Sequence, residues 1–143
     1  MKLTRFTDYA LRVLIYLGLK PDSRVTIREI SEAFQVSRNH LMKVVSNLTR
    51  LGYLDARRGP GGGLTLARPA REINLADVIC DMEEDLNLVT CFEDPANCVI
   101  SPACLLRRAL SDGLSAFMAT LGKYNLEDLL DPRSRLHKLL QID

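Results

Sequence analysis

The stretch from residue 26 to residue 52 most constrains the fold, because it pairs two amphipathic helix patterns across a three-residue break. The run from Thr26 to Glu29 fits a capping box and predicts that a short helix begins there. Residues 35–37 form the break, and the Ser37 hydroxyl is predicted to cap a longer second helix that ends at Gly52. The apolar residues that repeat at helical steps are Ile27, Ile30, Ala33, Phe34, Leu41, Val44, Val45, Leu48 and Leu51. This arrangement is typical of a helix-turn-helix, and a generic helical hairpin is the alternative.

A glycine-rich hairpin follows directly. Residues 53–57 and 64–67 alternate like two short strands, and a run of glycines joins them. Gly61 and Gly62 would let the backbone approach a phosphate closely, while Arg57 and Arg58 supply cations beside them. We therefore expect a mainly α, winged helix-turn-helix fold. A flexible turn is the alternative, whereas a nucleotide-cradling loop would need a Gly-Lys-Ser/Thr run that the sequence lacks.

Charge divides the chain near residue 71. Residues 1–71 hold 13 basic and 5 acidic residues, whereas residues 72–143 hold 6 basic and 13 acidic residues. We expect a DNA-binding domain over 1–71 and a second region over 72–143, because a basic half indicates a polyanionic partner. In a helix-turn-helix, the first turns of the second helix contact base edges in DNA, and four polar residues occupy that position here. The alternative is that these side chains are simply solvated. These residues are Arg38, Asn39, His40 and Lys43.

The rest of the composition narrows the class of protein. Hydrophobic residues make up 47% of the chain, yet no run approaches the ~18 apolar residues of a membrane span, and no signal core begins the sequence. We expect a cytoplasmic protein without a membrane partner, in which cysteines are reduced thiols or metal ligands. An enzyme is not expected, because no histidine or other evident base lies near a cysteine in the sequence.

Three cysteines gather in a polar, proline-bearing loop. Cys91, Cys98 and Cys104 are spaced C-x6-C-x5-C, which can bring three soft ligands around one site. The spacing differs from the paired C-x2-C of common zinc modules. An iron-sulfur cluster with a fourth ligand from elsewhere, a zinc site and a redox-switch thiol group therefore all stay open. Cys80, on a helix predicted to begin after Asn74, is expected to be a small core or boundary residue.

Two further helices and a C-terminal tail complete the chain. A first helix is expected over residues 7–20, and a long helix over 102–124 carries an apolar stripe too long for so small a domain to cover. Such a stripe predicts a homodimer, which would present two reading helices to an inverted-repeat DNA site, and a helix packed only on its own domain is the alternative. The tail, residues 125–143, is expected to pack back on the body. The stripe consists of Leu106, Leu110, Leu114, Phe117, Leu121 and Tyr124.

Four motifs occur together in order: residues 3–12, residues 36–41, the glycine run 58–63 and the three-cysteine loop. Together they resemble the winged-helix iron-sulfur regulator family that includes IscR, and within it the nitric-oxide-sensing repressors. The resemblance covers essentially the whole chain. It implies a homodimeric transcriptional repressor of double-stranded DNA that releases its operator when nitric oxide nitrosylates the cluster. A related cluster regulator that senses iron-sulfur or redox status is the alternative.

The same resemblance implies how the cluster is held. Cys91, Cys98 and Cys104 would be ligands, and 4Fe-4S is favoured over 2Fe-2S. IscR-like members place a histidine three residues after the last cysteine, where this sequence has Arg107. The nitric-oxide sensors instead recruit an aspartate from the other subunit, and Asp8 matches that position, with Arg12 beside it. Read without the family, Asp8 and Arg12 form an ion pair one helical turn apart.

Overall fold

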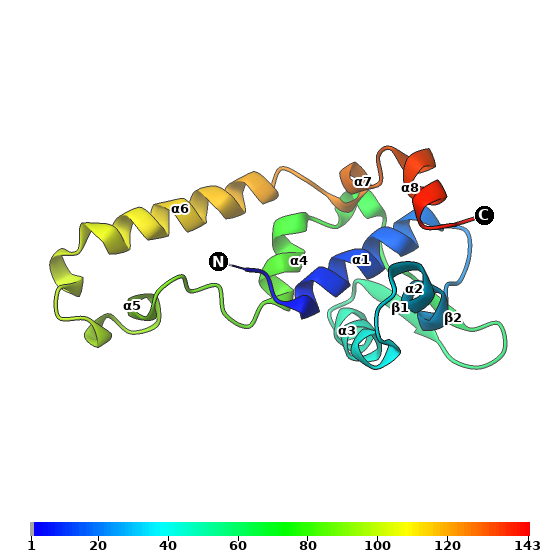
Figure 1. Cartoon of the computed structure of the whole chain (residues 1–143), viewed down its shortest axis with the longest axis horizontal. Coiled ribbons are helices and arrows are strands. Elements are labelled where there is room, and N and C mark those ends of the chain that lie inside the picture. Colours follow the sequence, from blue (N-terminus) through cyan, green and yellow to red (C-terminus); the bar gives the residue numbers. More distant parts are fainter. Residues whose placement is uncertain (1) are drawn as a thin grey trace.

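A computed structural model describes residues 2–143, and its elements form a mainly helical winged helix-turn-helix fold (Figure 1). Three short 3-10 turns cover residues 70–72, 95–97 and 101–103. The helices and strands are α1 (Arg5–Leu19), α2 (Ile27–Phe34), α3 (Arg38–Arg50), β1 (Leu54–Arg57), β2 (Gly63–Leu66), α4 (Leu75–Met82), α5 (Thr90–Glu93), α6 (Leu105–Leu121), α7 (Leu126–Leu129) and α8 (Arg133–Leu139).

The helix-turn-helix is confirmed, with one local correction. Thr26 and Glu29 form the reciprocal capping box that begins α2. Gln35 adopts a left-handed conformation with φ 54° and ends that helix. The predicted Ser37 cap is wrong: no side-chain hydrogen bond links Ser37 to the described start of α3, and its carbonyl accepts from the Leu41 amide instead. Because Ser37 is exposed, water can serve the free amides there.

The wing is a two-stranded antiparallel hairpin with its base fixed to the body. Leu54 pairs with Leu66 and Arg57 pairs with Gly63, so the ladder is a residue shorter than expected at Tyr53. Val25 forms a bridge with Leu64 from the segment before α2. This third segment ties the wing to the helix-turn-helix, so the two should move together.

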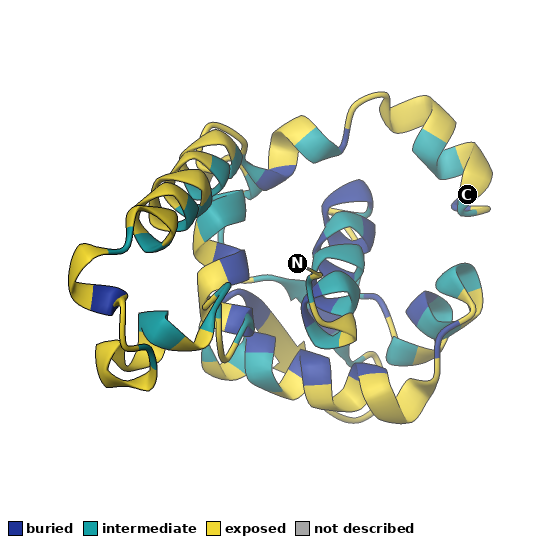
Figure 2. Ribbon diagram, turned by 60° about the vertical axis from the view of Figure 1, so that its left-hand side comes forward, coloured by how far each residue is buried: buried dark blue, intermediate teal, exposed yellow. Residues whose placement is uncertain are grey.

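One hydrophobic core contains residues from both sides of residue 71, and α1 runs through its centre (Figure 2). The expected return of the tail is confirmed, because Leu126, Leu130 and Ile142 are buried in this core. The tail also satisfies the C-terminal end of α1. The Arg133 guanidinium donates to the Gly18 carbonyl at 3.0 Å, and the His137 ring lies 3.1 Å from the Leu19 carbonyl.

The long helix is shorter than expected and leaves the body. It covers Leu105–Leu121, or about 26 Å at 1.5 Å per residue, because residues 101–103 form a 3-10 turn and Gly122 ends it. Each described residue of α6 is exposed or half-buried (Figure 2), and α6 contacts the body mainly through α4. The helix and the loop before it project from the rest of the chain (Figure 1).

Cys80 also departs from expectation. It is exposed on α4, so its assignment to the core or its boundary is wrong. The buried face of α4 consists of Val78, Ile79 and Met82, and Cys80 lies on the opposite side of that helix.

Candidate DNA interface and cysteine loop

The outer face of α3 presents the predicted reading residues together. The opposite face is fixed, because Leu41, Val44 and Leu48 are buried in the core. On the solvent side, the first two turns expose four side chains that can donate hydrogen bonds to bases or phosphates. These exposed residues are Arg38, Asn39, His40 and Lys43.

The wing tip exposes the predicted cations, and its glycines are needed for the geometry of the turn. Arg57 and Arg58 are exposed. Gly61 has φ 71°, in the left-handed region that favours glycine. A Cβ at Gly62 would collide with the Arg57 carbonyl and lie 2.8 Å from the Gly59 carbonyl oxygen. Gly62 is thus required by the turn itself, whatever the tip contacts.

A buried tyrosine that the sequence reading missed fastens the wing to α4. The Tyr53 hydroxyl donates to the Asp81 carboxylate, and the Arg68 guanidinium lies 4.4 Å from the centre of the Tyr53 ring. Burial raises the pKa of Tyr53 from its ordinary value, and the hydrogen bond to Asp81 raises it further. Only the apolar, strand-like character of residues 53–57 was visible in the sequence, since Asp81 is 28 residues away.

The cysteine loop consists of short turns that hold each thiol partly exposed. Cys91 lies in α5, Cys98 ends a 3-10 turn, and Cys104 precedes α6. All three are free thiols on half-buried residues.

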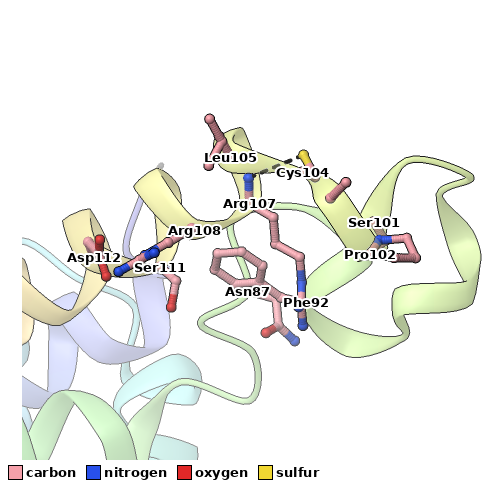
Figure 3. A pocket seen from close by; sticks show the side chains of 11 residues that line it. Asn87, Phe92, Ser101, Pro102, Cys104, Leu105, Arg107, Arg108, Ser111 and Asp112 are labelled. Atoms are coloured by element: carbon pink, nitrogen blue, oxygen red, sulfur yellow. Dashed lines mark hydrogen bonds between the residues drawn. The ribbon is translucent and has the colours of Figure 1, made fainter.

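Arg107 joins two of the three cysteine segments. Its backbone amide donates to the Cys104 sulfur at 3.4 Å, and its Nε donates to the Cys91 carbonyl at 3.1 Å. Figure 3 shows the Arg107 side chain reaching from α6 toward the loop that carries Phe92. In the sequence, Arg107 stands out only because IscR-like members have a histidine at that position. Its contact with Cys91 joins residues 16 positions apart, so no local pattern predicts it.

A cavity of about 650 Å³ opens between this loop and the start of α6. Arg107 and Arg108 give it positive charge, while Asp112 and Asn87 add polar groups. Ser101 also lines it, and its hydroxyl is buried without a hydrogen-bond partner among the described residues.

The donor chemistry of the loop fits an iron-sulfur cluster, since it offers three free thiols on one segment. The single chain does not gather them: among residues 2–143, no three cysteine, histidine or acidic side chains lie close enough to hold a metal ion. Asp8 lies instead on α1, where its carboxylate is 2.7 Å from the Arg12 guanidinium. Within the part of the chain that is described, no helix is long and apolar enough to cross a membrane.

Known proteins are similar to this chain in sequence and in fold. The family model Rrf2, described as an iron-dependent transcriptional regulator, matches residues 3–132. The HTH-type transcriptional regulator NsrR of Bacillus subtilis (strain 168) is 44% identical over 144 residues, which cover 99% of each chain. NsrR of Geobacillus kaustophilus (strain HTA426) is 45% identical over 143 residues, or 99% of this chain and 97% of its own.

The solved structure of CymR, the global cysteine regulator of B. subtilis, has a TM-score of 0.71 and is 25% identical. The likeness covers 90% of this chain and 95% of that chain. The Rrf2 family and the NsrR relatives are named as transcriptional regulators, which confirms the expectation that the chain is not an enzyme.

Proposed function

Because the chain belongs to the Rrf2 family of transcriptional regulators, we propose that it is a cytoplasmic repressor that releases DNA when nitric oxide reacts with its iron-sulfur cluster. The observation that carries the proposal is the presence, in one fold, of an exposed reading face on α3 and three free thiols in one projecting loop. In this proposal residues 1–71 bind DNA, and residues 72–143 hold the cluster and the dimer helix.

The DNA-binding part uses both exposed surfaces. Arg38, Asn39, His40 and Lys43 would enter the major groove, since they occupy the start of the second helix of the motif. Arg57, Arg58, Gly61 and Gly62 would place the wing against the backbone of the duplex. A homodimer formed through α6 would present two such surfaces to an inverted repeat.

The cluster would be held by Cys91, Cys98 and Cys104, with Asp8 of the partner subunit as the fourth ligand. When bound, it would supply iron that reacts with nitric oxide. Three thiolates and one carboxylate could hold either a 4Fe-4S or a 2Fe-2S cluster, and we propose the 4Fe-4S form. Within this chain Arg107 fastens the segments of Cys91 and Cys104. In this chain the Asp8 carboxylate is paired with Arg12. Whether Asp8 binds Arg12 or the cluster would set the position of α1 and of α3, which packs against α1. The cluster-bound and nitrosylated states would then differ in their free energy of binding to DNA, and this coupling between the cluster and DNA is reciprocal.

Anaerobic purification tests the cluster and its signal together. We expect a brown protein with matched iron and sulfide that bleaches on nitric oxide and releases inverted-repeat DNA. Cys91→Ser, Cys98→Ser and Cys104→Ser should each lose iron. The matched control is Cys80→Ser, since Cys80 is exposed on α4, outside the cysteine loop. A colourless protein that resists reconstitution would contradict the cluster.

The Asp8 assignment has its own test. Asp8→Ala should reduce cluster content or weaken the response to nitric oxide, whereas Asp22→Ala, in the exposed turn after α1, should change neither. Unaltered iron content and response in Asp8→Ala would sink the assignment while leaving the three cysteines in place.

One observation favours a second candidate function, a zinc-stabilised or thiol-switched repressor. The described residues of one chain do not gather three metal ligands, and each cysteine is free to react on its own. Zinc in freshly isolated protein would identify the structural-metal form. DNA binding that is lost on oxidation and restored by a thiol reductant, without any metal, would identify the switch.

A further inference from the structure

A cluster of side chains on α1 reaches the reading face of α3. The Arg12 guanidinium carbon lies 5.7 Å from the centre of the Tyr9 ring and 5.8 Å from the centre of the Phe34 ring. Both distances are within the range in which a cation is attracted to an aromatic face. Arg12 therefore contacts one ring on its own helix and one ring at the end of α2.

Tyr9 continues this contact to the DNA-reading surface. Its ring centre is 6.3 Å from the ring centre of His40, and the two planes are tilted by 34°. Aromatic pairs interact at centre separations of about 4.5 to 7 Å. His40 is exposed on the first turn of α3, so Tyr9 limits the directions in which the imidazole can point.

The other end of the cluster is the Asp8 carboxylate. Arg12 Nε donates to one Asp8 oxygen at 3.2 Å, and an Arg12 terminal nitrogen lies 2.7 Å from the other oxygen. This two-point contact fixes the plane of the guanidinium. A change in the partner of Asp8 would release that plane and with it the cation against the Tyr9 ring.

We propose that Tyr9 is a positioning residue that transmits the state of the Asp8–Arg12 ion pair to His40 on the reading helix. Asp8 bound to Arg12 holds the guanidinium against Tyr9, and Tyr9 holds His40. The proposal rests on the proposed function for its biological meaning, since it names how the Asp8 site acts on DNA recognition. The contacts themselves exist whether or not a cluster binds.

The sequence provides an internal control for a direct measurement, because the chain has only two histidines. Imidazole resonances of full-length protein can be assigned with the His40→Gln variant. Tyr9→Leu should move the His40 resonances, because the ring current of Tyr9 is lost, whereas Tyr9→Phe should leave them nearly unchanged. His137, which lies against the Leu19 carbonyl at the far end of α1, should stay unmoved in both variants.

The transmission step is tested by combining variants. Asp8→Asn should shift the His40 resonances in the wild-type background and have no such effect in the Tyr9→Leu background. A shift that persists without the Tyr9 ring would overturn the proposal, as would a His40 signal that responds to neither substitution. Movement of His137 together with His40 would show a general loss of structure and would also overturn it.

DNA binding gives the functional readout. Affinity for inverted-repeat DNA should fall about threefold to tenfold in Tyr9→Leu and in His40→Ala, with little further loss in the double variant. Additive losses would contradict coupling between the two rings. If no variant and no wild-type protein binds DNA, the proposed function fails, and the histidine spectra still decide the contact.

Discussion

Tyr53 is the residue that fastens the wing to the α4 side of the core, and removing its hydroxyl should loosen that attachment. Tyr53→Phe keeps the ring under Arg68 but deletes the hydrogen bond to Asp81. We expect a loss of about 1 kcal/mol in the free energy of unfolding, because Asp81 is exposed and water replaces its lost donor. Denaturant unfolding at neutral pH measures this. Asp81→Asn keeps an acceptor and should lose less; an equal or larger loss would contradict the argument.

The same tyrosine gives the protein a dependence on alkaline pH. An unfolded tyrosine ionises near pH 10, whereas the pKa of folded Tyr53 is raised by burial and by Asp81. The unfolded chain therefore loses its proton first as the pH rises. The stability from Tyr53 is present in full below pH 10 and is lost above it. Unfolding free energies measured from pH 9 upward should fall less steeply in Tyr53→Phe; an unchanged slope would contradict the raised pKa.

Single residues show where sequence reasoning reached its limit. The Thr26 and Glu29 cap was predictable, because both partners lie within one turn. Ser37 had the right residue type for a cap but makes no side-chain hydrogen bond to the described helix start. Arg107 and Tyr53 acquire their contacts from segments far along the chain, and no local pattern records such pairs.

At the scale of elements, the wing depends on a turn that tolerates no side chain at one position. Gly62→Ala should destabilise the hairpin by about 1 to 3 kcal/mol, because the new Cβ meets two backbone carbonyls that cannot rotate away. Gly61→Ala adds a Cβ in open space and should cost about 1 kcal/mol from its φ of 71° alone. Thermal unfolding ranks the two. DNA affinity should fall more in Gly62→Ala, and the reverse order would contradict the clash.

The contact between the end of α1 and Leu130, the residue that follows α7, also leaves little room. A Cβ at Gly18 would lie 2.8 Å from a methyl carbon of the buried Leu130 side chain. Gly18→Ala should therefore lower the free energy of unfolding by about 1 to 3 kcal/mol. In the Leu130→Ala background the added methyl has room, so the double variant should be less destabilised than the sum of the single variants. Simple additivity would show that the two residues do not compete for space.

The sequence periodicity predicted the positions of the helices and strands well, but it did not predict the residues at which they begin and end. The expected helix over residues 102–124 begins three residues late, because Ser101, Pro102 and Ala103 turn as a 3-10 helix instead. The loop before it was expected without regular structure, yet it contains α5 and two short turns. Segments of three or four residues carry too few positions to show a period.

At the scale of the whole molecule, α6 should decide the oligomeric state. Leu114 lies on the apolar stripe, and Leu114→Glu places a charge where a second copy would pack. We expect the dissociation constant of the dimer to rise by at least about tenfold, which corresponds to only 1.4 kcal/mol. Sedimentation equilibrium measures it. Ser115→Glu puts the same charge on the opposite, exposed side of the helix and should leave the dimer intact. Equal behaviour of the two variants would contradict an α6 interface.

For the candidate site, the sequence predicted which residues take part and which segments carry them, but not how the segments are arranged. Exposure of Arg38, Asn39 and His40 followed from the helix pattern, because the opposite side of α3 had to enter the core. The arrangement of the three cysteines could not be predicted, since their loop has few core contacts to fix it and the single chain leaves them ungathered.

The packing of the C-terminal tail against α1 also has a consequence for the order of folding during synthesis. The first helix to leave the ribosome has its last carbonyls satisfied by Arg133 and His137, and its core neighbours include Leu130 and Ile142. During synthesis the DNA-reading half is therefore made long before the residues that finish its core. A nascent chain halted before residue 126 would carry a complete reading helix on an unfinished support. The ability to bind an operator should thus arise only after translation has passed the cysteine loop and α6.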